Sequence, residues 1–298
     1  DYPFDNNYLD SGTSKVHSVL KDNAGNLWIA IYQKGVMMIP AQPNSFKYIG
    51  YKSINKNIIG SNCITSLCRD HEGILWIGTD NDGIYGITTE LKQKVHYAPH
   101  DSPSSVPSTV FGLYEDSEHN LWFGSYTNGL GRLDKKTGQC SYLQNLTDKH
   151  GNRIQRVYDL VEDQDKRLWI ATMGAGLFYY DLKTGQSVYD PKFNAATEKY
   201  KWISCLLYAG DNHLYVGTYD GIRCIDLSTD DFKTEEILSR HIIHSLYEDP
   251  QGNIWIGSSD GLAEWNPQTR QLKTYTTAHG LSSNAVYAIK GDGQDNLW

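Results

Sequence analysis

A short apolar pattern recurs along the whole chain, and its clearest copy is Ile254-Trp255-Ile256-Gly257. Each copy is centred on one aromatic residue, which we call the anchor; the anchors are Trp28, Trp76, Trp122, Trp169, Tyr215, Trp255 and Trp298. They are 40 to 48 residues apart, so the chain is a series of repeats. A repeat of this length, made of short strands and turns, is typical of a β-propeller with one sheet per repeat.

The residues before each anchor predict a strand. Twelve positions before the anchor the residue is always β-branched, which favours a strand: Val16, Ile64, Val110, Val157, Ile203, Ile243 and Val286. Nine positions before it the residue is always apolar, and ten positions before it the residue is mostly small, as at Ser66 and Gly112. We interpret this segment as the innermost strand of each sheet, with little space near the axis.

The rest of each repeat predicts three more strands. An Asp stands six positions before every anchor except Tyr215, where Ala209 replaces it, and we expect this Asp to cap the amides of a hairpin turn. The anchor strand follows, and Gly or Ala two positions after the anchor indicates a close approach between backbones. Gly-marked bends then lead to a third strand, such as 221–226, and to a short outer strand, such as 271–275. Each repeat therefore predicts four antiparallel strands.

These patterns predict an all-β fold: a seven-bladed β-propeller of four-stranded antiparallel blades, formed by residues 1–298 as a single domain. The last blade is incomplete, because the seventh repeat stops at its anchor Trp298. An open propeller leaves strand edges unpaired, so we expect the chain to be part of a longer multidomain protein.

Charge and composition exclude several functions. The net charge is −8 and the Lys and Arg residues are spread singly, which argues against nucleic acid as a partner. No apolar run is long enough to span a bilayer, so any membrane contact is expected through segments outside this chain. The five Cys and ten His show no metal-ligand spacing, and 80–83 indicates a turn rather than a calcium loop. We therefore predict no metal, no cofactor and no catalytic residue.

At Asp249, Gly252-Asn253-Ile254-Trp255-Ile256-Gly257 and Gly261-Leu262, the chain resembles the two-component regulator propeller repeat. Residues 280–289 are similar to that family's connector and inner strand. The resemblance implies a periplasmic sensor region of a hybrid two-component system, of the kind found in gut Bacteroidetes. It also implies an oligosaccharide ligand that controls glycan-utilisation genes, a homodimer, and a histidine kinase outside this chain.

Two rings of positions vary between repeats, as a binding face requires. One ring follows each anchor by four positions, and the other precedes the anchor by thirteen or fourteen. Strand direction alternates, so both rings are expected at the same mouth of the central channel. Aromatic, amide and charged side chains there suit the stacking and hydrogen bonding of sugar rings. The predicted ligand-binding residues are Tyr32, Asp80, Tyr126, Asn128, Arg156, Trp202, Tyr219 and His241.

Two other classes of function stay open. One is a glycan lyase or hydrolase on a propeller, since the Asp-containing hairpin also resembles the Asp-box of sialidases. The Arg residues are scattered, however, and an Asp repeated in every blade is more readily architectural than catalytic. The other is a structural scaffold that holds a dimer together, in which case the aromatic residues pack against a neighbouring blade or domain.

Overall fold

The structure is a computed structural model that describes residues 15–33, 35–39, 41, 49, 59–61, 63–88, 93–148, 150–189, 201–229, 231–292 and 296–298. It divides into two compact units. The smaller comprises Asp1–Asn62 and Leu91–Gln93, and the larger comprises Cys63–Glu90 and Lys94–Trp298. No helix of the described residues is both long and apolar enough to cross a membrane.

The smaller unit contains the first repeat as an antiparallel sheet in the order β1-β2-β3. Its strands are β1 (Val16–Lys21), β2 (Leu27–Ile31) and β3 (Gly35–Ile39), and the anchor Trp28 lies in β2. The described residues of this repeat thus give three strands where the sequence predicts four, and residues 40 and 42–48 lie outside them.

The larger unit contains five sheets of four strands, each arranged in chain order. The strands of repeats two and three are β4 (Ile64–Arg69), β5 (Leu75–Thr79), β6 (Ile84–Ile87), β7 (Gln93–Tyr97), β8 (Val110–Glu115), β9 (Leu121–Ser125), β10 (Leu130–Leu133) and β11 (Cys140–Tyr142). Those of repeats four to six are β12 (Val157–Glu162), β13 (Arg167–Thr172), β14 (Leu177–Asp181), β15 (Gln186–Val188), β16 (Ile203–Ala209), β17 (His213–Thr218), β18 (Gly221–Asp226), β19 (Thr234–Ser239), β20 (Ile243–Glu248), β21 (Ile254–Ser258), β22 (Gly261–Asn266) and β23 (Gln271–Tyr275).

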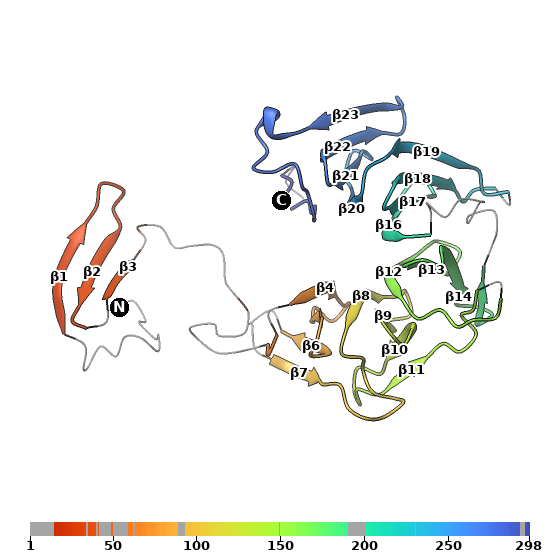
Figure 1. Cartoon of the computed structure of the whole chain (residues 1–298), viewed down its shortest axis with the longest axis horizontal. Helices are drawn as coiled ribbons and strands as arrows, with labels where there is room; N and C mark the ends of the chain where they lie inside the picture. The colour runs from red at the N-terminus through yellow and green to blue at the C-terminus, as the bar shows by residue number, and fades with distance from the viewer. Residues whose placement is uncertain are drawn as a thin grey trace. The chain divides into compact units, whose positions relative to one another are not determined.

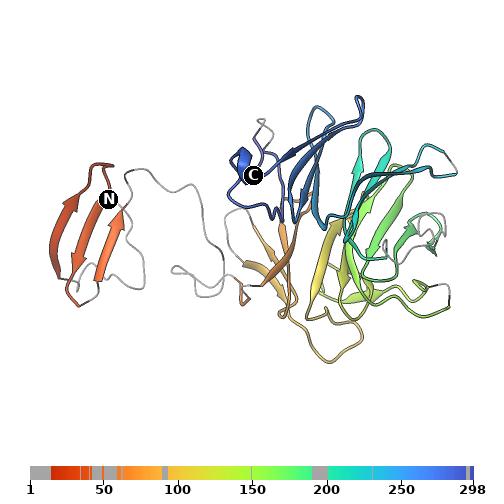
Figure 2. The ribbon, with the colours of Figure 1, turned by 45° about the horizontal axis from the view of Figure 1, so that its top comes forward.

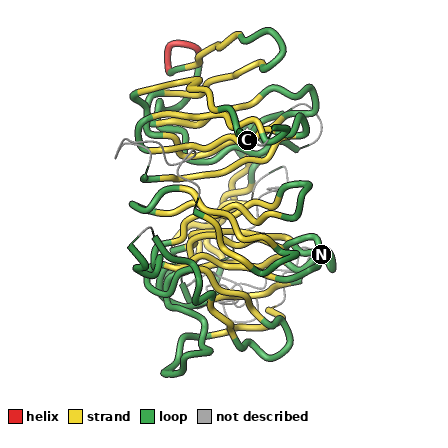
Figure 3. Tube along the Cα trace, turned by 90° about the vertical axis from the view of Figure 1, so that its right-hand side faces the viewer, coloured by secondary structure: helices red, strands yellow, loops and turns green. Residues whose placement is uncertain are grey.

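In the larger unit, the first strand of each sheet lies innermost. Within the larger unit, β4, β8, β12, β16 and β20 contact one another in succession and face a common centre (Figure 1). The sheets follow one another around that centre in chain order, from orange to blue (Figure 2). Strands and loops make up almost all of the trace, and the 3₁₀ turn η2 (Thr277–His279) is the short red segment (Figure 3). The predicted all-β class and the inner position of the first strand are confirmed.

The seventh repeat is present as the start of a hairpin. Val286 donates a backbone hydrogen bond to Ser258 at 2.9 Å, which joins this segment to the sixth sheet. Lys290 and Trp298 exchange two backbone bonds of 3.1 and 2.9 Å. Six sheets are thus described with part of a seventh repeat, and the count of seven blades stays a prediction.

The recurring Asp joins the hairpin turn to the anchor side chain. Asp70 accepts the backbone N–H of Ile74 and the indole N–H of Trp76, both at 2.8 Å. The same indole bond forms at Asp22, Asp116, Asp163 and Asp249, at 2.7 to 2.8 Å. The predicted turn cap is confirmed, and the indole bond explains why repeat five lacks both partners. There Tyr215 replaces Trp, and the turn closes through a backbone bond from Asn212 to Ala209.

The small residue after each anchor allows neighbouring sheets to approach. A Cβ atom on Gly124 would lie 2.5 Å from the carbonyl oxygen of Val157, the first residue of the next sheet. On Gly78 it would lie 2.4 Å from Ser66 Oγ and 3.1 Å from Val110 O. The predicted close approach is therefore a contact between adjacent sheets as well as within one.

A second recurring bond crosses from one sheet to the next, and we call it the joint bond. A Glu seven positions before the anchor accepts a backbone N–H from the hairpin turn of the preceding repeat. Glu115 and Glu162 accept at 2.6 Å from His71 and Ser117, and Glu248 accepts at 3.1 Å from Gly210. In repeat five Tyr208 stands at the position of this Glu, and its hydroxyl donates to Asn212 Oδ1 of the same repeat at 2.9 Å. After repeat six the equivalent residues are Pro250 and Gly291, which have no backbone N–H and no side chain respectively.

Candidate aromatic site at the channel mouth

The two predicted rings meet at one edge of the larger unit. The backbone N–H of Tyr219 donates to Trp202 O, and that of Met173 to Arg156 O, both at 3.1 Å. Isolated bridges pair Met173 with Trp202 and Asp80 with Thr109, each across two successive repeats. The residue four after one anchor therefore lies beside the residue thirteen before the next anchor, as the sequence analysis expects.

Six side chains from repeats three to five form two groups of contacting residues at this edge, which we together call the aromatic arc: Phe111, Tyr126, Arg156, Tyr158, Trp202 and Tyr219. The Arg156 guanidinium lies 5.0 Å from the Tyr126 ring centroid. Tyr126 meets Phe111 edge-on at 5.9 Å, and Phe111 packs on Tyr158 at 4.8 Å.

The other end of the aromatic arc is formed by Tyr219 and Trp202, whose ring centroids are 6.0 Å apart. Burial raises the pKa of Tyr158, and the nearby Tyr219 raises it further. Tyr126, Trp202 and Tyr219 remain 43%, 40% and 43% exposed. Large rings at this exposure offer apolar faces to a ligand in solution.

The structure brings together four of the eight predicted residues: Tyr126, Arg156, Trp202 and Tyr219. Asp80 is exposed at the same edge and accepts a 3.0 Å bond from Thr109 Oγ1. Asn128 lies in the bend after β9, where its amide oxygen accepts a 2.7 Å bond from Thr127 Oγ1 and its backbone N–H donates to Ser125 Oγ at 2.8 Å. His241 is half-buried, with Nδ1 2.7 Å from Ser239 O. Tyr32 belongs to the smaller unit, where it stacks on His17 at 5.1 Å.

Phe111 and Tyr158 are the residues that sequence reasoning missed. Both stand eleven positions before an anchor, where the pairing of the first and second strands shifts register. A β-bulge of this kind turns one side chain out of the regular alternation. In the larger unit the bulge residues Thr65, Phe111, Tyr158, Ser204 and His244 all line a central cavity of about 440 Å³. The sequence signal that could have identified them is an aromatic residue eleven positions before the anchor.

Asp159 is the carboxylate on the wall of this cavity. Its oxygens accept backbone N–H groups from Leu160 at 2.9 Å and from Leu206 at 2.8 Å. Burial outweighs these bonds and raises the pKa of Asp159 to about 6. The folded protein therefore favours the protonated form of this group more than the unfolded chain does.

Asp159 gives the first testable prediction, a change of stability with pH. The penalty of its ionised form is present above the folded pKa and is relieved as the pH falls from about 7 through 6. The contribution of this group to the free energy of unfolding should thus rise over that interval. In Asp159→Asn the rise should be absent, as measured by melting midpoints at about pH 7 and about pH 5. Asp134→Asn, at an exposed turn, should retain the rise, and an equal slope in both variants would contradict the assignment.

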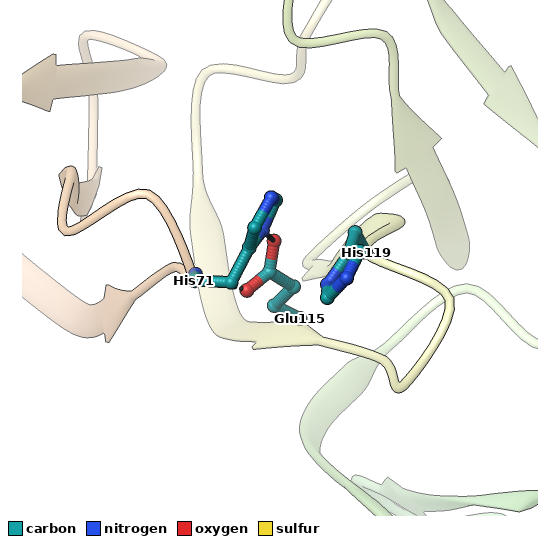
Figure 4. A group of neighbouring side chains, drawn as sticks. All are labelled: His71, Glu115 and His119. Atoms are coloured by element: carbon teal, nitrogen blue, oxygen red, sulfur yellow. Dashed lines mark hydrogen bonds and ion pairs between the residues drawn. The ribbon is translucent and has the colours of Figure 1, made fainter.

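A second cluster lies at the turns of repeats two and three, away from the aromatic arc. His71, Glu115 and His119 each offer a ligand atom, all within 4.8 Å of one another (Figure 4). The His71 and His119 rings are stacked, with centroids 3.7 Å apart and planes 23° apart. Two imidazoles that bind one metal normally direct their in-plane lone pairs at it, which nearly parallel stacked rings do not do.

The carboxylate of this cluster already has cationic and polar partners. Lys135 Nζ lies 2.6 Å from Glu115 Oε1 and 3.3 Å from Asp70 Oδ2. Burial raises the pKa of Glu115, but the bonds from Lys135 and His71 outweigh burial and lower it. The cluster therefore serves the joint between sheets two and three, and a metal would have to displace Lys135.

Comparison with known proteins identifies the repeat. The family described as "Two component regulator propeller" matches residues 58–81, 104–127, 153–174 and 237–260. A curated relative, histidine kinase P4 of Formosa agariphila, is 22% identical over 286 residues, which are 93% of this chain and 18% of the relative. The chain thus spans less than a fifth of that protein.

The solved structures that resemble the chain support the propeller fold. The extracellular domain of a putative hybrid two-component system from B. thetaiotaomicron superposes with a TM-score of 0.64 and 19% identity, covering 99% of this chain and 38% of that one. Virginiamycin B lyase from Staphylococcus aureus gives 0.62 and 14%, with 97% and 92% covered. The fold alone does not distinguish a sensor from an enzyme. The four segments that match the family model add a similarity of sequence to the similarity of fold. Four segments of this chain therefore match the two-component regulator propeller repeat, and its fold is similar to that of the extracellular domains of hybrid two-component systems from B. thetaiotaomicron.

Proposed function

We propose that this chain is an extracytoplasmic sensor propeller of a hybrid two-component system. It would bind an oligosaccharide, or transmit its binding, to a histidine kinase that controls glycan utilisation. The observation that carries the proposal is the aromatic arc at the channel mouth of a two-component regulator propeller. Seven blades, a periplasmic location and a homodimer are parts of the same proposal.

The arc has the chemistry that sugar rings require. The C–H faces of a pyranose pack on exposed Tyr and Trp rings, while its hydroxyls need hydrogen-bond donors and acceptors at the edge. Tyr126 and Tyr219 supply faces at opposite ends, and Trp202 forms a wall beside Tyr219. Asp80 and Arg156 supply polar groups at the same edge.

The enzyme alternative is less well supported by the side chains. A glycan hydrolase commonly needs two carboxyl groups that flank the scissile bond. Among the described residues that line the central cavity, Asp159 is the one carboxylate. Its two oxygens already accept backbone N–H groups. The resemblance to virginiamycin B lyase is one of fold, at 14% identity.

The test is calorimetric titration of the complete sensor region with neutral and acidic oligosaccharides. Tyr126→Ala and Tyr219→Ala should each weaken binding by roughly 1–3 kcal/mol, the usual cost of removing a well-packed aromatic contact. Their melting midpoints should change little, because both rings are exposed at the edge. Tyr275→Ala, on the outer strand β23, should leave affinity unchanged. Full affinity in both arc variants would contradict a site at the channel mouth.

A further inference from the structure

Arg156 is held at the channel mouth by its backbone and by an aromatic ring. Its carbonyl accepts the N–H of Met173, and its guanidinium carbon lies 5.0 Å from the Tyr126 centroid. A guanidinium on an aromatic face keeps its in-plane N–H groups free to donate outward. The cation is therefore oriented at the edge where the ligand is proposed to bind.

No carboxylate of the described residues lies within ion-pair distance of Arg156. Two Arg residues differ in this respect: Arg167 contacts Asp163 at 2.6 Å and Asp165 at 2.9 Å, and Arg270 pairs with Glu235. At the mouth, Asp80 accepts from Thr109, and on the wall Asp159 accepts from two backbone N–H groups. Within the described part of the chain, Arg156 is thus a positive group without a carboxylate partner, in a protein of net charge −8.

We infer, resting on the proposed function, that the ligand is an acidic oligosaccharide whose uronic-acid carboxylate pairs with Arg156. The planar guanidinium fork matches a carboxylate with two parallel N–H···O bonds. The adjoining Tyr126 ring and the rest of the aromatic arc contact the sugar faces. The overall negative charge repels long polyanions, so short acidic fragments are favoured over the intact polysaccharide.

The experiment compares each acid with its own neutral form. The complete sensor region is titrated with oligosaccharides of galacturonate, mannuronate and glucuronate, with their methyl esters, and with neutral gluco- and galacto-oligosaccharides. The acid that binds should lose roughly tenfold or more in affinity on esterification, the range of a charge-assisted hydrogen bond. Arg156→Gln should lower affinity for the acid roughly 10- to 100-fold and change affinity for the ester little.

Arg132→Gln is the matched control, because Arg132 also lies over an aromatic ring, 5.9 Å from Trp122, but on strand β10. It should leave both affinities unchanged. Equal binding of acid and ester, or tighter binding of a neutral oligosaccharide, would overturn the acidic ligand and leave the sensor proposal intact. Binding of no oligosaccharide at all would overturn the proposed function and this inference with it.

Discussion

Replacing Asp116 with Ala is expected to lower the free energy of unfolding by about 3 kcal/mol. The carboxylate accepts backbone N–H groups from Glu118 at 3.0 Å and Asn120 at 2.8 Å, and the indole N–H of Trp122 at 2.7 Å. Asp116 and Trp122 are 2% and 3% exposed, so water cannot replace the lost acceptor. A buried donor left unpaired costs about 1–3 kcal/mol; the Trp122 indole N–H is buried and the Asn120 N–H is partly buried.

Chemical denaturation of Asp116→Ala and Asp134→Ala would test this. Asp134 also caps a turn, accepting N–H groups from Lys136 and Thr137 at 2.8 and 3.0 Å, but the turn is exposed. Its loss should cost about 1 kcal/mol or less, because water can satisfy the freed amides. Similar losses in the two variants would show that the indole bond contributes little.

Gly124→Ala is expected to destabilise the fold by about 3 kcal/mol through overpacking. The added Cβ would lie 2.5 Å from Val157 O and 2.8 Å from Val157 Cγ1, so the backbone of the next sheet would have to move. Repeat four has Ala171 at the equivalent position. The space beside this position therefore differs from one pair of neighbouring sheets to the next.

The matched control for this substitution is Gly210→Ala, in an exposed turn where the nearest atom to the added Cβ would be 3.6 Å away. Its free energy of unfolding should change by less than about 1 kcal/mol, since the new contact is an ordinary one. A Gly124→Ala protein as stable as Gly210→Ala would mean that the sheets separate easily and that their contact is not tightly packed.

The fold was largely predictable because its main signals are local. The Asp and the anchor Trp are six residues apart and share one hairpin, so their partnership recurs at fixed spacing. Gly124 and its equivalents also stand at a fixed position, although they approach atoms of the next repeat, such as Val157 O beside Gly124 and Val110 O beside Gly78. Local patterns predict each blade but not the number of blades in a closed propeller. The first sheet has three described strands and the seventh repeat is incomplete, so the number of blades is not tested.

The site was less predictable because its residues are defined by contacts between repeats. Tyr126 and Arg156 were found from the variable rings, but Phe111 and Tyr158 depend on a bulge that the regular alternation of strands conceals. Asn128 is predicted from its position after an anchor, and the bond that its amide oxygen accepts comes from the adjacent Thr127. The cluster of His71, Glu115 and His119 joins residues more than forty positions apart, which no spacing rule detects.

The joint bonds make the ring mechanically uneven. Joints with Glu115, Glu162 or Glu248 tie one sheet's turn to the next sheet, whereas Pro250 and Gly291 offer no donor and no acceptor side chain there. Strain applied across these sheets concentrates where the bonds between sheets are fewest. Compared with the three glutamate joints, the boundary between repeats six and seven therefore deforms most easily. Amide hydrogens beside it should exchange with solvent sooner than those at the glutamate joints, and a ligand that stiffens the ring would slow that exchange most.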